Sequence, residues 1–270
     1  MALPVSAGAI RKLLREVESS GGGEHVLAVG GARELAPVLR EQLLRGGAEP
    51  AAVRLGEPRG ANVYVHVLAG EPGDGDRETL RDAARERVPV VAVVCGADAA
   101  AIPYVLATDV VRAGAGREFP LEPIAQTIAA RLGERGAPLA GRIPTLRAAV
   151  CEQLVESFAR RNGIVAAAPW LRGASFPLLA LNQLRLVLRV AQAHGAEGPR
   201  ERLPELAATL GAGFGLRALA RELLDRAPDA AWLLNGAIAY GGTRLLGEAA
   251  RVRFELEPRP RRAAAGRAAP

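Results

Sequence analysis

Residues 25–43, HVLAVGGARELAPVLREQL, combine a short apolar strand pattern, two glycines and a helical pattern. An α/β protein often holds a phosphate at such a strand-to-helix turn. Further strand patterns lie at 51–55, 62–68 and 88–95, and helical patterns lie at 32–45, 76–87 and, after an apolar segment at 104–111, near 120–133. Because strands alternate with helices, we expect an α/β fold with a mostly parallel, Rossmann-like sheet covered on both faces.

The carboxyl ends of parallel strands form the rim at which ligands bind in sheets of this kind. From the strand patterns we expect one rim to carry a set of ligand candidates: Gly30, Gly31, Asp98, Thr108 and Asp109, with Gly70 and Cys95 beside them. The run PGDGD at 72–76 is a predicted loop, in which Asp76 is expected to be the N-cap of the next helix.

The turn after the first strand lacks the groups of a phosphate-binding loop. Such a loop needs a lysine for the outer phosphates and a serine or threonine hydroxyl for magnesium. No lysine follows Lys12, Ala32 follows the glycines, and Glu34 would place a carboxylate where a phosphate would bind. The later glycines of a dinucleotide-binding GxGxxG are also missing. The sequence therefore predicts a tight turn without a nucleotide phosphate.

Two neighbouring strand patterns, ANVYVHVLAG at 61–70 and VPVVAVVCGAD at 88–98, resemble adjacent strands of small GTPases. In that family the second strand ends in the guanine-reading Asn-Lys-x-Asp. Here only Asp98 matches, because Cys95 and Gly96 take the positions of the Asn and the Lys. The resemblance implies a degenerate, GTPase-like domain. Because the chain departs from the family at both the phosphate loop and the guanine-reading motif, we expect it neither to bind nor to hydrolyse a nucleotide.

The second half of the chain is predicted to be all-α. Helical patterns run over 145–161, 176–194, 200–210, 214–226 and 230–250. The segment from Gly133 to Arg147, which contains GERGAPLAGRIPT, has helix breakers and is expected to be a linker with little to bury.

One predicted helix, FPLLALNQLRLVLRVAQAHG, carries a polar stripe on an otherwise apolar surface. The stripe consists of Asn182, Arg185, Arg189 and Gln192, at spacings of three and four. We expect this helix to pack on a bundle or lie on a surface, because two arginines oppose a membrane span. Gln183 lies among apolar residues and should be partly buried with a hydrogen-bond partner.

The last predicted helix has small residues four positions apart, at Asn235, Ala239, Thr243 and Gly247. This spacing lets another helix approach closely. The uncharged run from Ala230 to Thr243 is too short to span a bilayer, so helix packing is the expected use of these residues.

Three stretches of this half, LNQLRLVLRVAQAHG, LGAGFGLRALAREL and GAIAYGGTRLLGEA, resemble the bacterial helical domain of unknown function that is fused to, or encoded with, Era-like GTPases. The resemblance covers about residues 147–250 and points to Gln183, Gly195, Thr243 and Gly247 as shared positions. It implies association with membranes and carries no catalytic motif.

Charge and composition narrow the partner classes. Residues 1–140 have a net charge of −2, from 16 basic and 18 acidic residues, whereas residues 141–270 have a net charge of +8, from 19 and 11. The basic half suggests an anionic lipid surface or an acidic protein; nucleic acid ranks last because no aromatic-rich basic motif accompanies the charge. A solvated helical surface explains the same charge. His25, His66, His194, Cys95 and Cys151 lack metal-ligand spacing, so no metal and no cofactor is expected.

The sequence thus predicts a GTPase-like α/β domain at 1–140, a helical domain at 145–256 and a disordered basic tail at 257–270. The N-terminus has no secretion signal, which indicates the cytoplasm. We expect a non-enzymatic adaptor that docks to a protein partner or to the inner face of the membrane, with homo-oligomers left open. The helical docking candidates are Asn182, Gln183, Arg185, Arg189, Thr243 and Gly247. The alternatives are a nucleotide-binding protein with an unorthodox loop and an integral membrane protein with helical hairpins.

Overall fold

The structure is a computed structural model that describes residues 6–96, 101–114, 116, 118–168, 175–196 and 231–256. Its first half is a five-stranded parallel sheet in the order β2-β1-β3-β4-β5. The strands are β1 (Leu27–Gly31), β2 (Val53–Leu55), β3 (Val63–Leu68), β4 (Val90–Cys95) and β5 (Val110–Ala113). This is the flavodoxin-like, doubly wound order, with the switch point between β1 and β3. The predicted parallel α/β sheet is confirmed.

The two central strands follow directly from their composition. Every residue of β3 (VYVHVL) and β4 (VVAVVC) is buried, as expected for strands covered on both faces. On one face, α2 (Ala36–Arg45) and α4 (Leu121–Leu132) pack against alternate strand residues such as Val65 and Val93. On the other, α3 (Asp74–Arg85) packs on the remaining positions with help from Ile102.

The start of α3 differs from the expectation. Gly73 is the N-cap, and Asp76 is the third residue of the helix, so the prediction of Asp76 as N-cap is wrong. The Asp76 carboxylate reaches back to accept a hydrogen bond from the Gly73 backbone N–H at 2.9 Å. This bond still satisfies one exposed donor of the helix start, which is the task that the N-cap side chain would have performed.

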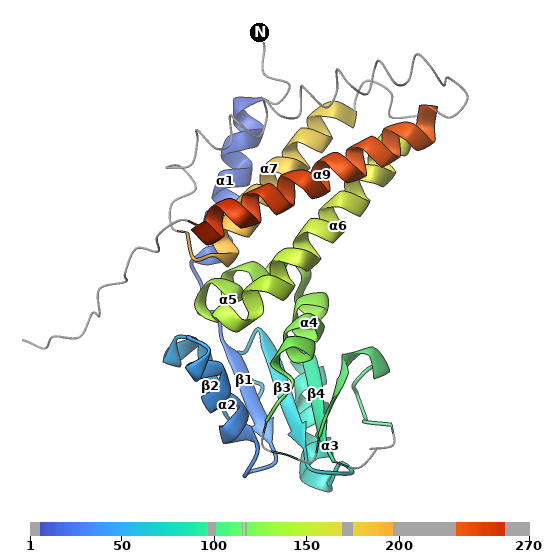
Figure 1. Cartoon of the computed structure of the whole chain (residues 1–270). Helices are drawn as coiled ribbons and strands as arrows, with labels where there is room; N and C mark the ends of the chain where they lie inside the picture. Colours follow the sequence, from blue (N-terminus) through green and yellow to red (C-terminus); the bar gives the residue numbers. More distant parts are fainter. Residues whose placement is uncertain are drawn as a thin grey trace, which may run out of the picture.

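The helical part lies beyond the amino ends of the strands and leaves their carboxyl ends at the opposite pole of the molecule (Figure 1). Its helices are α5 (Gly136–Arg142), α6 (Arg147–Ala167), α7 (Ser175–Ala193) and α9 (Ala231–Leu256). The patterns at 145–161, 176–194 and 230–250 therefore correspond to real helices. The predicted helices at 200–210 and 214–226 and the tail at 257–270 lie outside the described residues.

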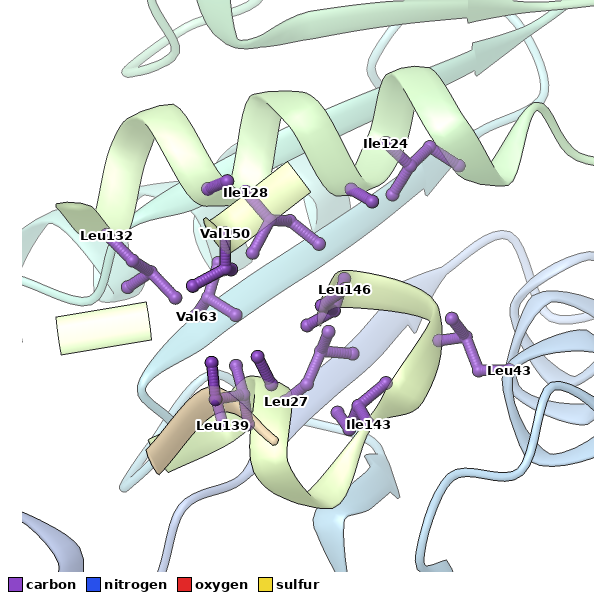
Figure 2. Close-up of a cluster of buried hydrophobic side chains, with 14 of the residues drawn as sticks. Leu27, Leu43, Val63, Ile124, Ile128, Leu132, Leu139, Ile143, Leu146 and Val150 are labelled. Carbon is purple, nitrogen blue, oxygen red and sulfur yellow. The ribbon is translucent and has the colours of Figure 1, made fainter. Parts of the chain in front are cut away.

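The expected linker is wrong, because much of the segment after α4 is buried. Leu139 and Ile143 are fully buried, as is Leu146 in the short helix η4 (Pro144–Leu146). Figure 2 shows these side chains meeting Leu27 and Val63 of the sheet and the α4 side chains. Arg142 also donates to the His25 carbonyl just before β1, at 2.9 Å. A single hydrophobic core therefore continues from the sheet into the helices.

A helix that the sequence patterns did not indicate precedes the sheet. Helix α1 (Ala7–Gly21) begins at Ser6, whose side chain caps it, and lies beside α7 (Figure 1). Its Leu13, Leu14 and Val17 form a separate apolar cluster with residues of α7. Although α1 comes before β1 in the chain, it packs as part of the helical layer.

The shared core predicts that sheet and helices unfold together. We expect Ile143→Ala to lower the free energy of unfolding by about 2–5 kcal/mol, because it leaves a cavity between the two parts. Hydrogen exchange should accelerate in β3 and α6 alike. Ile164→Ala is the matched control: Ile164 is 73% exposed, against 0% for Ile143, and should change stability by less than about 0.5 kcal/mol. Two separate unfolding transitions in the wild-type protein would contradict the shared core.

Candidate functional site

The predicted rim begins with Gly30 and Gly31 at the end of β1, beside the switch point. A Cβ on Gly30 would collide with the Tyr64 hydroxyl, and one on Gly31 would collide with the Val67 carbonyl. Gly31 also has φ +97°, which favours glycine. Both glycines are thus required by the packing of the chain against itself, in agreement with the predicted tight turn.

Thr108 and Asp109 do not belong to this rim. The apolar segment at 104–111 suggested a strand that ends there, but β5 starts only at Val110, so both residues precede it. They lie at the amino edge of the sheet, where Asp109 pairs with Arg131 near the end of α4 at 3.3 Å. The placement of Thr108 and Asp109 on the carboxyl rim was wrong. Asp98 lies outside the described residues.

Gly70 and Cys95, the other predicted rim residues that the structure describes, offer no activated nucleophile. Gly70 follows β3 with φ +157°, and Cys95 ends β4 as a free, buried thiol. Burial raises the pKa of Cys95, which disfavours the thiolate needed of a nucleophile. Cys151, the free cysteine of α6, is more deeply buried, and burial raises its pKa to about 12.

Below the rim lies a buried chain of polar side chains that the sequence patterns did not reveal. Tyr64 and His66 point to the same face of β3, and the Tyr64 hydroxyl lies 3.1 Å from His66 Nδ1. His66 Nε2 lies 2.9 Å from Oδ1 of Asp76, at the start of α3. A neutral His66 ring satisfies both contacts by accepting from Tyr64 and donating to Asp76. The chain therefore ties α3 to the centre of the sheet.

Burial favours the uncharged forms of both Tyr64 and His66. Burial raises the pKa of Tyr64, and the Asp76 and Glu57 carboxylates raise it further. Burial lowers the pKa of His66, against the opposing effect of its hydrogen bond to Asp76. Tyr64 and His66 are each 1% exposed, and Gly30 covers the hydroxyl. The three groups thus resemble a proton relay in composition, but Tyr64 and His66 present no atom to a substrate in solution.

The predicted docking residues of the helical part divide into two groups, and the first is an internal network. The Asn162 amide of α6 donates to the Thr243 hydroxyl of α9 at 2.9 Å, and the Asn182 amide of α7 donates to Asn162 at 2.9 Å. Gln183 donates to the same hydroxyl at 3.4 Å, so its expected burial and partner are confirmed. Asn162, which links Asn182 to Thr243, is a member of this network that the sequence pattern did not indicate. The network fixes how three helices meet.

Gly247 belongs to the same helix contact. A Cβ at this position would lie 2.5 Å from a methyl group of Val155 on α6, so only a glycine allows this approach. Gly195 follows the end of α7 with φ +76° and lies against Gly141 of α5. The small residues thus serve close packing within the chain, as the spacing of Thr243 and Gly247 predicted.

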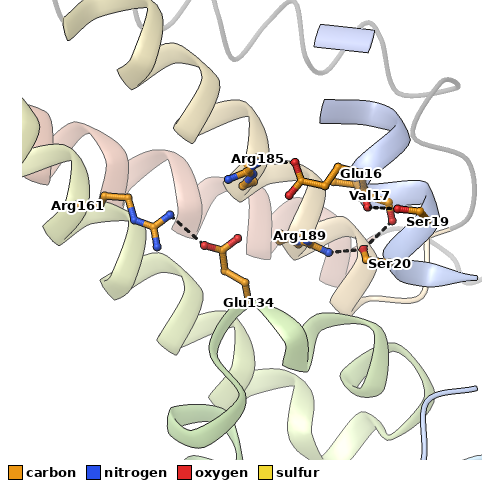
Figure 3. Close-up of polar contacts among 8 residues, drawn as sticks. All are labelled: Glu16, Val17, Ser19, Ser20, Glu134, Arg161, Arg185 and Arg189. Atoms are coloured by element: carbon orange, nitrogen blue, oxygen red, sulfur yellow. Dashed lines mark hydrogen bonds and ion pairs between the residues drawn. The ribbon is translucent and has the colours of Figure 1, made fainter. Parts of the chain in front are cut away.

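The second group, Arg185 and Arg189, faces α1 (Figure 3). Arg185 pairs with Glu16 at 2.6 Å, and Arg189 donates to the Ser20 hydroxyl at 2.5 Å and to Gln192 at 2.9 Å. Arg189 is only 7% exposed, and burial lowers its pKa. Helix α1 therefore lies against the two arginines that were proposed for docking, and of the two expectations for α7, packing in a bundle or lying on a surface, the structure shows the first.

An accessible apolar face of the helical part is the outer side of α9, which points away from α6 and α7 (Figure 1). Leu245, Val252 and Leu256 on this side are 70%, 50% and 79% exposed. Exposed apolar side chains that recur along one helix face are typical of a surface that binds a partner. This outer face of α9, defined by these three leucine and valine positions, is the candidate functional site.

Comparison of the chain with protein-family models, with curated proteins and with solved structures finds no match. Among the described helices, none combines the length and the apolar character that a membrane span requires. Within the ranges that the structure describes, no three His, Cys, Asp or Glu side chains gather as metal ligands.

The buried His66 predicts a dependence of stability on pH. The folded chain keeps His66 neutral, whereas the unfolded chain protonates it near pH 6.5. The free energy of unfolding should therefore fall as the pH drops below about 6.5, by up to about 1.4 kcal/mol per pH unit for this proton. His66→Gln should reduce that slope in urea titrations. His25→Gln is the comparison, because burial also lowers the pKa of His25. This variant should remove only the contribution of His25 to the slope and keep that of His66. An unchanged slope in His66→Gln would contradict a neutral His66.

Proposed function

We propose that this protein is a non-enzymatic adaptor of the cytoplasm that docks to a protein partner through the outer face of α9. The observation that carries the proposal is the exposure of Leu245, Val252 and Leu256 on the part of α9 whose opposite side is buried from Thr243 to Phe254. Exposing such residues to water is unfavourable by roughly 1.5–3 kcal/mol for each side chain that a partner would bury. A partner that covered them would gain that free energy.

The geometry of the rim supports a role without catalysis. The two glycines at the switch point are taken up by contacts with Tyr64 and Val67, and the buried thiols are held protonated. The sheet has the flavodoxin-like strand order, which does not itself point to a GTPase. The proposal of a degenerate GTPase-like domain therefore rests only on the sequence resemblance at 61–70 and 88–98. The resemblance of the helical part to the domain associated with Era-like GTPases favours a role beside such an enzyme.

A nucleotide-binding test addresses the proposal that the GTPase-like domain is degenerate and binds no nucleotide. We expect no saturable rise of the melting temperature with GTP or ATP up to millimolar concentration in magnesium, relative to magnesium alone. A ligand that binds only the folded chain stabilises it by about 2.7 kcal/mol at roughly a hundred times its dissociation constant. A clear, saturable rise would instead support the alternative of a nucleotide-binding protein with an unorthodox loop.

A capture experiment addresses the docking half. The full chain is used as bait in extracts of its native cells, as wild type, as Val252→Glu and as Ile164→Glu. A charge in the centre of the outer face should abolish capture, because it would be buried without a partner. Ile164 is 73% exposed on α6, so the same change there should leave capture intact. If all three baits retain the same proteins, the outer face of α9 is not the docking site.

A further inference from the structure

Helix α9 has two heptad-spaced rows of residues on opposite sides. The inward row is Thr243, Gly247, Ala250 and Phe254, all buried against α6 and α7. The outward row is Leu245, Ala249, Val252 and Leu256, all exposed, at the alternating spacings of four, three and four. This second row has the spacing of a coiled-coil seam, in which apolar residues at a and d meet those of a second helix. Leu245 and Val252 take d positions, and Ala249 and Leu256 take a positions.

The charges beside this seam complement those of an identical helix. Glu248 precedes the seam residue Ala249 at a g position, and Arg253 follows Val252 at an e position. In a parallel pair, g of one helix lies beside the e position five residues later in the other. Glu248 of each copy would therefore face Arg253 of its partner. We propose that the outer face of α9 binds a second copy of this chain, with the two α9 helices parallel and in register.

The charges also select the orientation. In an antiparallel pair, g positions face each other, which would bring Glu248 against the same-sign Glu255. Like charges at this distance are destabilising. Arg251 takes a c position outside the seam. Its guanidinium forms ion pairs within the same helix, at 3.1 Å from the Glu248 carboxylate and 3.9 Å from the Glu255 carboxylate. The parallel arrangement keeps both of these contacts and adds the pair between copies.

The mixed signs distinguish a second copy from a lipid surface. An anionic membrane attracts a face whose flanking charges are basic. Glu248 and Glu255 beside the outer row would oppose such a surface, whereas Arg253 of a second copy complements Glu248. The seam has only four positions, which is short for free helices. However, α9 is already held by α6 and α7, so no helix has to form on binding.

The inference rests on the docking function proposed above and is tested with the full chain by sedimentation and light scattering over a range of concentrations. The wild-type chain should dimerise, and Val252→Glu should raise the dissociation constant of the dimer by more than about a hundredfold. Ile164→Glu, which adds the same charge on α6, should dimerise like the wild type. Circular dichroism of each variant verifies that these exposed substitutions leave the fold intact.

Charge reversal tests the register. Glu248→Arg and Arg253→Glu should each weaken self-association by about tenfold or more, because each places like charges side by side between copies. An equimolar mixture of the two variants should recover dimers, since every pair in the mixed dimer is again of opposite sign. Arg244→Glu is the control, with the same change of charge on α9 at a position away from the seam. Val252→Cys should also cross-link to itself on mild oxidation, whereas Ala237→Cys, exposed on α9 outside the seam, should not.

Three results overturn the inference. A wild-type chain that remains monomeric at every concentration refutes the second copy, and so does a dimer that persists in Val252→Glu. A monomer that co-sediments with vesicles containing phosphatidylserine, and loses this binding in Val252→Glu, identifies lipid as the occupant instead. None of these results by itself refutes docking to another protein, which fails only when Val252→Glu captures the same proteins as the wild type.

Discussion

The burial of α5 and η4 between the sheet and the helices is the constraint on which the rest of the structure depends. These elements cover the amino ends of β1 and β3 with Leu139, Ile143 and Leu146, and Arg142 ties them to the backbone before β1. The helices that follow can pack only where this segment places them. As a result, the carboxyl rim and the outer face of α9 lie at distant parts of one continuous body (Figure 1).

The conspicuous polar residues of the chain are used mainly for internal cohesion. Arg185 and Arg189 hold α1, the Asn162 and Asn182 amides join three helices through Thr243, and His66 joins β3 to α3 through Asp76. A buried polar group costs free energy unless it is paired, so each contact constrains its helix or strand to one position. Such contacts explain specificity of packing without requiring a ligand. Accessibility, rather than chemical character, is what singles out α9.

The sequence predicted the elements whose signal is local. Continuous apolar runs in β3 and β4 and the spacing of Thr243 and Gly247 reported burial correctly, because each pattern reflects the faces of its own strand or helix. What failed depended on partners far along the chain. Periodicity showed that Arg185 and Arg189 share a face but could not show that α1 covers it. Glycines and prolines at 133–147 are equally compatible with a loop and with a buried turn, and strand pattern alone could not locate where β5 begins.

Tyr64 and His66, below the rim, also show that the sequence reveals local spacing but not a distant partner. Their spacing of two places both on one face of a strand, which is readable from sequence, but the third partner, Asp76, comes from the next helix. The outward row of α9 was readable too, since its spacing is visible once the helix is known to extend to Leu256. The helical pattern in the sequence predicts a helix only to residue 250, which leaves Val252 and Leu256 outside it.

The contact between α1 and α7 has a consequence for how the chain folds during synthesis. Arg185 and Glu16 are 169 residues apart, so α1 leaves the ribosome long before the helix that covers its apolar side. At typical elongation rates of about 5–20 residues per second, α7 is synthesised several seconds or more after α1. During that time Leu13, Leu14 and Val17 lack the α7 residues that they contact in the folded chain. Contacts of such high sequence separation form late, because a long loop must close first. Closure of α1 onto α7 is therefore expected among the last steps of folding, after the sheet is complete.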